Sequence, residues 1–306
     1  HLTLGENIAD QGGITIAYVN EDYQLCKRQS ANAVTFNAGH VRNFGTLGTG
    51  YTAVTGNTVL RFAGDDVQFT GRLKKLAGGT GAVAATDNVI EKIVFKAHSL
   101  YSSGYASGDT QVSAGVSAVP AYACLKGTTM YVYTEAPRFT LNASSGNLFR
   151  DFAALKEVTF NNVDAQANTS IEWMFRNDFA LETIDFGVCD LSTVTNMSFM
   201  CQNITTLKTV RFGKTATTAC TNFKAMFSGC TNVAELNLGP NFTLSHLADK
   251  SMCNNAFYNT AQVFGPTTEK CKLYMSQAEY DACTTGSCSN SALNKARFYF
   301  YPVSAE

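Results

Sequence analysis

A pattern of apolar positions recurs through the middle of the chain. Four segments share the order apolar-x-x-apolar-x-apolar, and they begin at equal intervals of 26 positions, at Leu155, Leu181, Leu207 and Val233. The last two apolar residues of each segment flank one polar residue, which is the period-2 alternation of a half-buried strand. The pattern predicts four short strands whose apolar residues point inward and whose polar residues point to the other face.

A second motif precedes three of these strands at the same interval. "TSIEWMFRN" begins at residue 169, "TNMSFMCQN" at 195 and "TNFKAMFSGC" at 221. Threonine is a good N-cap, and the apolar residues that follow it recur at a spacing of three to four. This predicts one or two turns of helix with one buried face. A fifth copy, 252–263, follows its counterpart at 222–233 by four positions more than the regular interval, which indicates an insertion.

A single unit of this length cannot fold alone. It buries about six apolar side chains, which stabilise it by roughly 9–18 kcal/mol. Ordering its residues costs about 40 kcal/mol. Stacked units supply the missing burial, because strand pairs with strand and helix packs on helix. A period of this size with this apolar order is typical of leucine-rich repeats. The sequence therefore predicts an α/β fold, a leucine-rich-repeat-like solenoid with parallel strands on one face and short helices on the other.

The same motifs resemble a known family. "TNMSFM…LKTVRFG" and "TNFKAMFSGCTNVAELNLG" are similar to the repeats of the BspA-like leucine-rich-repeat surface proteins of bacteria and some protists, which run roughly T-N-M-x-x-M-F-x-G-C-x-x-L-x-x-L-x-L. The resemblance is clearest over 155–263. A degenerate copy is expected over 123–155, and "VIEKIVF" (89–95) is the candidate first strand. The resemblance implies a scaffold that hosts many binding roles.

The two ends differ from the middle. Residues 1–80 hold β-type runs broken by Gly, Asn and Asp, and they predict a β-rich N-terminal region that is either a cap or a separate module. Residues 81–265 form the predicted solenoid. Residues 266–306 are the predicted C-terminal cap, with a strand at "CKLYM", a short helix at "SQAEYDAC" begun by Ser276, and a final strand at "ARFYFYPV". A cap is needed because the bare end of a solenoid exposes its core.

Composition and charge exclude several classes of function. Charged residues make up 15% of the chain and the net charge is −1, whereas about 25% charged residues is typical. A polar but weakly charged surface suits an extracellular protein. The sequence has no basic stripe, which argues against a nucleic-acid partner. No apolar run approaches the roughly 18 residues that span a bilayer, so membrane insertion is not expected.

Candidate chemistry is sparse, and we expect no enzyme, no cofactor and no metal. The four His are scattered, and no C-x-x-C pair exists, so a zinc site is not indicated. "GTLGTG" (45–50) resembles a phosphate loop but lacks the Lys-Ser/Thr that follows in such loops. The ten Cys are expected to be mostly buried free thiols. The best candidate for a disulfide is Cys283–Cys288.

The remaining candidate site is a surface. The outward positions of the four strands line the concave side of a solenoid, which is its usual binding surface. They form a polar row of mixed charge without an aromatic: Glu157, Thr159, Thr183, Asp185, Thr209, Arg211, Glu235 and Asn237. Such a row suits hydrogen-bonded recognition of a protein or a glycan. The alternative is that these are ordinary strand residues that keep the face soluble.

Arg211 is the strongest single candidate in this row. It lies in the central unit, and Arg is enriched at interface hot spots because its planar fork satisfies two acceptors at once. The alternative is that Arg211 only neutralises Asp185 across the strands, which would contribute less than about 1 kcal/mol when exposed.

Two functions remain open. The first is a secreted or surface-displayed binding protein, adhesin-like, located outside the cell or at its surface. The second is a structural subunit of an extracellular filament, fimbria, phage fibre or coat, at a cell or virion surface, with the solenoid as a rigid scaffold. Low charge, many Thr, Asn and Gly, and a β-rich N-terminal region that could pair with a neighbour's edge favour self-assembly of this kind.

Overall fold

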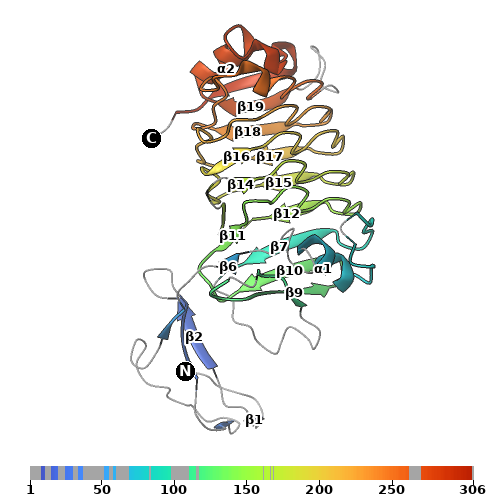
Figure 1. Ribbon diagram of the computed structural model, residues 1–306, viewed down its shortest axis with the longest axis vertical. Helices are drawn as coiled ribbons and strands as arrows, with labels where there is room; N and C mark the ends of the chain where they lie inside the picture. The colour runs from blue at the N-terminus through green and yellow to red at the C-terminus, as the bar shows by residue number, and fades with distance from the viewer. Residues whose placement is uncertain are drawn as a thin grey trace.

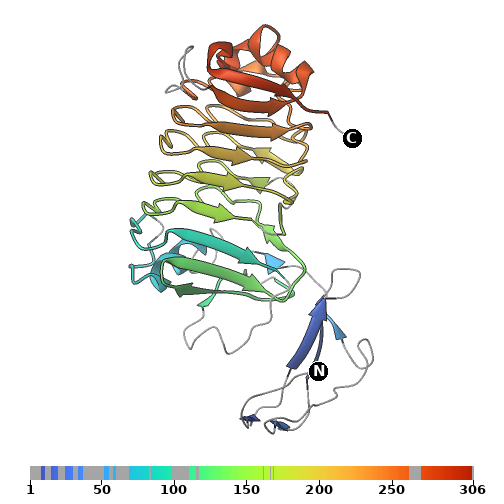
Figure 2. The ribbon, with the colours of Figure 1, turned by 180° about the vertical axis from the view of Figure 1, so that it is seen from behind.

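The computed structural model describes residues 8–10, 15–19, 25–29, 34–36, 52–54, 58–59, 69–82, 84–97, 110–114, 117–160, 162–165, 167, 169–261 and 270–304. Its main feature is a ten-stranded sheet with the strand order β20-β19-β18-β17-β15-β12-β7-β10-β9-β8. In both ribbon views the strands lie one above another along the long axis of the molecule (Figures 1 and 2). The protein is α/β, with a large, mostly parallel sheet and few helices in its described part.

The strands of this main sheet are short. They are β7 (Lys92–Lys96), β8 (Thr110–Gln111), β9 (Ala121–Lys126), β10 (Thr129–Thr134), β12 (Glu157–Thr159), β15 (Thr183–Asp185), β17 (Thr209–Arg211), β18 (Glu235–Gly239), β19 (Cys271–Met275) and β20 (Phe298–Pro302). Neighbours are parallel except in the pairs β8–β9 and β9–β10. The four strands that the repeat predicts are β12, β15, β17 and β18, and they are adjacent and parallel, which confirms the prediction. The candidate first strand is also confirmed, because β7 pairs in parallel with β12.

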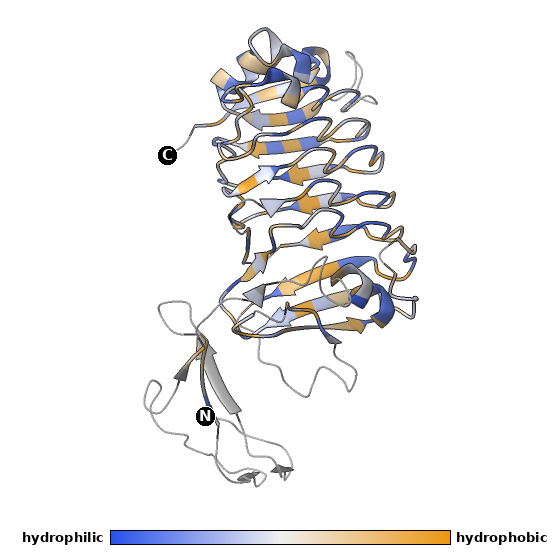
Figure 3. Cartoon of the chain, viewed as in Figure 1, coloured by the Kyte–Doolittle hydropathy of each residue, from blue (hydrophilic) through white to orange (hydrophobic). Residues whose placement is uncertain are grey.

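The register places equivalent residues of successive units side by side. The central inward residues pair strand to strand and are fully buried: Val158, Ile184, Val210 and Leu236. The aromatic residues two positions later pack ring against ring, with centroids 4.9 and 5.1 Å apart: Phe160, Phe186 and Phe212. Hydrophobic and hydrophilic residues alternate along the strands (Figure 3). The core therefore consists of equivalent buried side chains that pack on one another from unit to unit along the stack.

The prediction of short helices on the other face is wrong. Segments 169–177, 195–203 and 221–229 form turns instead. Their amides bond to the next unit: Ile171 N donates to Asn196 O at 2.9 Å and Met197 N to Asn222 O at 2.8 Å. A helix would bond each amide to the residue four positions earlier, so these turns satisfy their backbone along the stack.

Left-handed backbone conformations also stop a helix in these segments. Each turn has two residues with positive φ, four positions apart: Trp173 and Asn177, Phe199 and Asn203, Ala225 and Gly229. A left-handed residue is incompatible with a right-handed helix and is adopted most easily by Gly and Asn. The apolar spacing still identified the buried side chains, because the turns direct the same residues inward.

Smaller sheets complete each turn of the chain. β6 (Thr58–Val59), β11 (Phe139–Leu141) and β13 (Val163–Ala165) form one parallel sheet. β14 (Thr169–Ser170) pairs in parallel with β16 (Val194–Asn196), and a bridge from Asn196 to Asn222 carries this ladder into the next unit. The chain thus contacts its own previous turn on more than one side.

The C-terminal segment has the predicted strand–helix–strand order. α2 (Gln277–Thr284) lies between β19 and β20, and the Ser276 hydroxyl accepts a hydrogen bond from Glu279 N at 3.3 Å, which confirms the predicted N-cap. Three short 3-10 helices also occur among the described residues: η1 (Lys250–Cys253), η2 (Ser289–Ser291) and η3 (Lys295–Arg297). α2 and its neighbours lie at the end of the stack (Figure 1).

The N-terminal region contains several strands, as its β-type runs predict, and one helix, which begins within the last of these runs (57–71), where the pattern predicts β structure. β1 (Ile8–Asp10) pairs with β4 (Val34–Phe36), and β2 (Thr15–Val19), β3 (Leu25–Gln29) and β5 (Thr52–Ala53) form a second antiparallel sheet. α1 (Phe69–Leu76) packs on the main body through Phe69, whose ring centroid lies 6.2 Å from that of Phe95. The division at residue 80 stays a prediction, but α1 and β6 join the later part of the chain.

The segment expected as a degenerate copy is only partly one. Residues 121–134 form the antiparallel hairpin β9–β10, which the repeat does not contain. Farther on, Phe149 N donates to Met174 O and Asp151 N to Arg176 O, both at 2.9 Å, so this part stacks on the next unit as a regular copy does.

All ten cysteines are free and buried, which confirms the expectation of core thiols. The predicted bridge between Cys283 and Cys288 is not formed, because the two thiols face different partners. Cys288 Sγ donates to Leu244 O at 3.4 Å, whereas Cys283 Sγ lies 3.9 Å from Glu279 Oε1. Burial raises the pKa of the Cys230 thiol to about 12, so it stays protonated and unreactive.

Candidate binding surface

The eight predicted residues lie on one face of the main sheet, as expected. They form two rows across β12, β15, β17 and β18. The first row is Glu157, Thr183, Thr209 and Glu235, and the second is Thr159, Asp185, Arg211 and Asn237. Each of these side chains is half-buried, whereas the residue between them on every strand is buried. Strands lie about 4.8 Å apart, so the rows form one continuous polar surface.

The charges on this surface are paired with one another. Arg211 Nε lies 2.9 Å from Glu235 Oε1, and Arg211 Nη1 lies 3.6 Å from Asp185 Oδ2. The alternative role weighed for Arg211, that of neutralising its neighbours, therefore fits the geometry, with Glu235 as the nearer partner. Such exposed pairs stabilise a fold by less than about 1 kcal/mol each. A charged ligand would have to displace them.

A third ion pair joins the predicted row to the next strand, β7. Lys92 Nζ on β7 is 2.8 Å from Glu157 Oε1, and the Thr159 hydroxyl donates to the same oxygen at 2.8 Å. The hydrogen bond from Lys92 is the main reason that the pKa of Glu157 is lowered. The polar groups between Glu157 and Glu235 in the first row are those of Thr183 and Thr209, and Asn237 lies beyond Arg211 in the second row.

The same face continues past the predicted row into the C-terminal strands. Glu235 is in register with Lys272 and then Tyr299, and Asn237 is in register with Tyr274 and then Tyr301. Tyr299 is 49% exposed and Tyr301 is 42% exposed. The predicted row itself has no aromatic residue, but the face that continues from it has three tyrosines. The prediction stopped at the four regular copies, although the alternation in "CKLYM" and "RFYFYP" indicates that the face continues.

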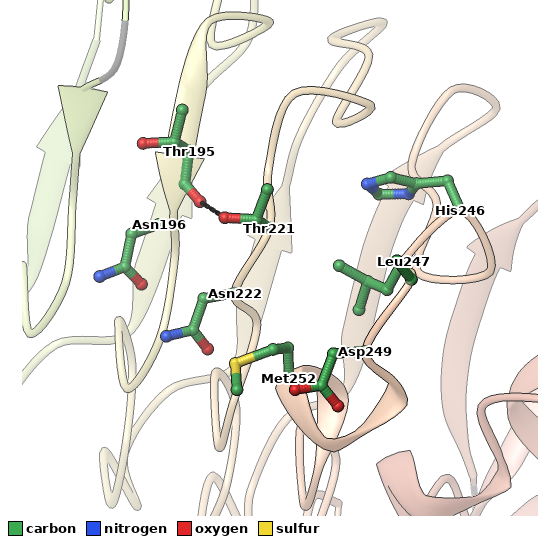
Figure 4. A pocket seen from close by; sticks show the side chains of 9 residues that line it. Thr195, Asn196, Thr221, Asn222, His246, Leu247, Asp249 and Met252 are labelled. Carbon is green, nitrogen blue, oxygen red and sulfur yellow. Dashed lines mark hydrogen bonds between the residues drawn. The ribbon is translucent and has the colours of Figure 1, made fainter.

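A pocket of about 650 Å³ lies on another side of the stack. It is lined by Thr195, Asn196, Thr221, Asn222, His246, Leu247, Ala248, Asp249 and Met252 (Figure 4). The insertion in the fifth copy explains it. Met197 N bonds to Asn222 O at the regular interval, whereas Phe223 N bonds to Met252 O, four positions beyond that interval. The extra residues before Met252 leave the ladder and form one wall of the pocket.

Several polar groups of this pocket are already used by the fold. The Thr221 hydroxyl donates to Thr195 O at 3.2 Å, as the dashed line in Figure 4 shows. His246 Nε2 lies 2.8 Å from Cys220 O, and Asp249 Oδ1 accepts from Ser251 N at 2.9 Å to cap η1. The Asn196 and Asn222 amides, one unit apart, point the same way (Figure 4). The pocket is thus a consequence of the insertion, and its chemistry is less distinct than that of the sheet face.

Buried charge in the described residues has a structural role. Lys74 Nζ on α1 donates to Ala85 O and to Arg150 O, both at 2.7 Å, and burial lowers its pKa. Asp178 is fully buried, which raises its pKa well above the usual value, and its Oδ1 accepts from Phe152 N at 2.9 Å. These contacts tie α1 and the first turns together.

No group of three or more His, Cys, Asp and Glu side chains in the described part of the chain could hold a metal ion. His1, His40 and His98 lie outside the described residues, as does "GTLGTG". Among the residues that the structure describes, no helix is both long and apolar enough to cross a bilayer. Comparison of the chain with protein-family models, with curated proteins and with solved structures finds no match.

Proposed function

We propose that the chain is a leucine-rich-repeat-like solenoid of the BspA-like kind, secreted or displayed at the cell surface, that recognises another macromolecule through the outward face of its main sheet. The observation that supports this most is the continuous polar face across β7, β12, β15, β17, β18 and β19, built largely from residues that recur every 26 positions. Stacked repeats commonly bind through such a surface.

Two further features support recognition over catalysis. The face is rigid, because each strand is hydrogen-bonded to a neighbour on both sides, and rigid surfaces lose little entropy on binding. Its ion pairs neutralise its own charge, so hydrogen bonding by Thr and Asn side chains is left to select a partner. A weakly charged chain with an adhesin-like role fits an extracellular location.

The proposal is tested by crowding the centre of the face. In Thr183→Arg/Thr209→Arg, two long side chains stand beside Glu157 and Glu235, so the fold is kept and the surface is blocked. The matched control, Thr218→Arg/Ala219→Arg, adds the same charge at exposed residues before Cys220. Binding to immobilised matrix proteins and to cells should weaken at least about tenfold in the face variant, roughly 1.4 kcal/mol, and stay unchanged in the control.

Equal binding by both variants would move the site to the loops or to the N-terminal β region and overturn the proposal. Light scattering on the same samples distinguishes the adhesin-like function from that of a structural subunit. A monomer that binds the panel fits the adhesin-like role, whereas filaments that bind nothing on the panel would favour a scaffold.

A further inference from the structure

The C-terminal end of the main sheet carries three tyrosines on its outward face, which we call the tyrosine platform: Tyr274, Tyr299 and Tyr301. The rings of Tyr274 and Tyr301 are stacked, with centroids 4.9 Å apart and planes inclined by 17°. Lys270 Nζ lies 5.5 Å from the ring centroid of Tyr299. Exposed aromatic rings gathered on one rigid surface differ from single exposed apolar residues, which are normal on any protein.

One ring face of the platform is open. Tyr274 and Tyr301 lie side by side on neighbouring strands, so their stacked rings face along the row that crosses the strands. One face of the Tyr301 ring therefore contacts Tyr274, and the other points away from the sheet. β20 is the last strand of this sheet among the described residues. Tyr301 keeps 42% of its surface exposed, in agreement with a ring that is covered on one side.

β20, which carries Tyr301, is fixed by contacts on its inner side. On the inner side of β20, Phe298 is buried and Phe300 stacks on Tyr280 of α2, with ring centroids 4.0 Å apart. Val303 N donates to Met275 O at 3.1 Å and fixes the end of the strand. The platform is therefore preorganised, and a ligand would not have to order it.

Polar groups border the rings on the side of the predicted row. Asn237 is in register with Tyr274, and Lys272 is in register with Tyr299. Asn237 Oδ1 accepts from Gly239 N at 3.1 Å, which orients its amide group. Asn237 lies on the far side of Tyr274 from the open face of Tyr301, so the hydrogen-bonding groups nearest that face are the tyrosine hydroxyls and the Lys272 ammonium.

We propose that the tyrosine platform binds a neutral glycan. A pyranose ring has an apolar face of C–H groups and a rim of hydroxyls, and these match the open Tyr301 ring and the polar groups of Tyr299 and Lys272 beside it. The C–H groups carry partial positive charge, which the negative face of an aromatic ring attracts. This inference rests on the proposed function and names the ligand class of the same face.

The outward charges from β15 to β19 balance one another, because Lys272 is in register with Glu235, and this favours a neutral ligand over an acidic one. Arg211, two strands away from Tyr274, is already paired with Asp185 and Glu235. A protein partner would cover about 800 Å² and would have to desolvate these ion pairs. A short glycan on the platform leaves them in water.

The test measures binding of neutral tetrasaccharides of glucose, N-acetylglucosamine, mannose or galactose to the full chain by calorimetry. The wild-type chain should bind at least one of them. Tyr301→Ala should weaken that binding about tenfold, and Tyr301→Phe, which keeps the ring, should stay within about twofold of the wild type. The matched control is Tyr258→Ala, since Tyr258 is 50% exposed and lies in the turns rather than on the sheet face.

Absence of binding to all four sugars, or equal binding by Tyr301→Ala and the wild type, would overturn the inference. This failure is distinguishable from failure of the proposed function. If the matrix-protein panel still binds the wild type and not the Thr183→Arg/Thr209→Arg variant, the face binds a protein and the platform does not bind glycans. If the wild-type chain binds neither the sugars nor anything on the matrix-protein panel, both proposals fail.

Discussion

Replacing Val210 with Asp is expected to unfold the repeat region. Val210 is fully buried between Ile184 and Leu236, its partners on the two neighbouring strands. The substitution places an unpaired carboxylate between two units, and this should cost more than about 4 kcal/mol. Urea unfolding followed by circular dichroism measures the loss.

The control changes the adjacent residue to the same side chain. Thr209 is half-buried on the outward face and pairs with Glu235, so Thr209→Asp adds only a like-charge contact in water. Its expected cost is at most about 1 kcal/mol. Equal losses in the two variants would mean that the faces of the strand are assigned the wrong way round.

Replacing Gly213 with Ala is expected to destabilise the stack strongly through the backbone. Gly213 has a φ of +65°, and a Cβ atom there would collide with the carbonyl oxygen of Gly187, one unit earlier. That carbonyl cannot easily retreat, because Phe186 N is bonded to Arg211 O at 2.9 Å. We expect a loss of about 3 kcal/mol or more in the free energy of unfolding.

Gly187→Ala separates this collision from the cost of a left-handed residue. Gly187 also has positive φ, +43°, but a Cβ atom there would meet only Asp185 Oδ1, at 3.5 Å. Its expected cost is about 1–2 kcal/mol, the penalty for a left-handed residue with a side chain. Urea denaturation of both variants gives the difference. If Gly213→Ala is no worse than Gly187→Ala, the units do not approach each other this closely.

The strands and their register were predictable from the sequence because the apolar order leaves little freedom. The inward apolar position recurs every 26 residues. Each strand has to pair with the next in this register, because a shift by one residue would move its apolar side chains to the solvent face. This is why Val158, Ile184, Val210 and Leu236 pair as expected. The outward row followed from the same alternation.

The turns were mistaken for helices because the two share an apolar spacing. What separates them is where the amides bond, and a hydrophobic pattern carries no information on that. A signal was nevertheless present: Asn177, Asn203 and Gly229 recur at the same interval and all have positive φ. Asn and Gly at such positions favour the left-handed conformation that ends a helix.

The position of the candidate surface was predictable, and its chemistry was less so. The partner of Arg211 depends on side-chain reach between strands, and the sequence suggested Asp185, whereas Glu235 is nearer. The tyrosines of β19 and β20 were assigned to a cap, because their spacing departs from the repeat. The pocket beside Met252 arises from an insertion that was visible in the sequence, but its shape depends on how the inserted loop folds.

The central claim is that successive units stack in register so that their polar residues share one surface. Spin labels at Lys92→Cys and Lys272→Cys test it, because the ten native thiols are buried and do not compete for the label. These positions are in register across five strand spacings, through Glu157, Thr183, Thr209 and Glu235.

Pulsed electron paramagnetic resonance on this pair should give one narrow distance near roughly 24 Å, about 5 Å longer than for a Glu157→Cys/Lys272→Cys pair. A broad distribution, or equal distances for the two pairs, would contradict the stack.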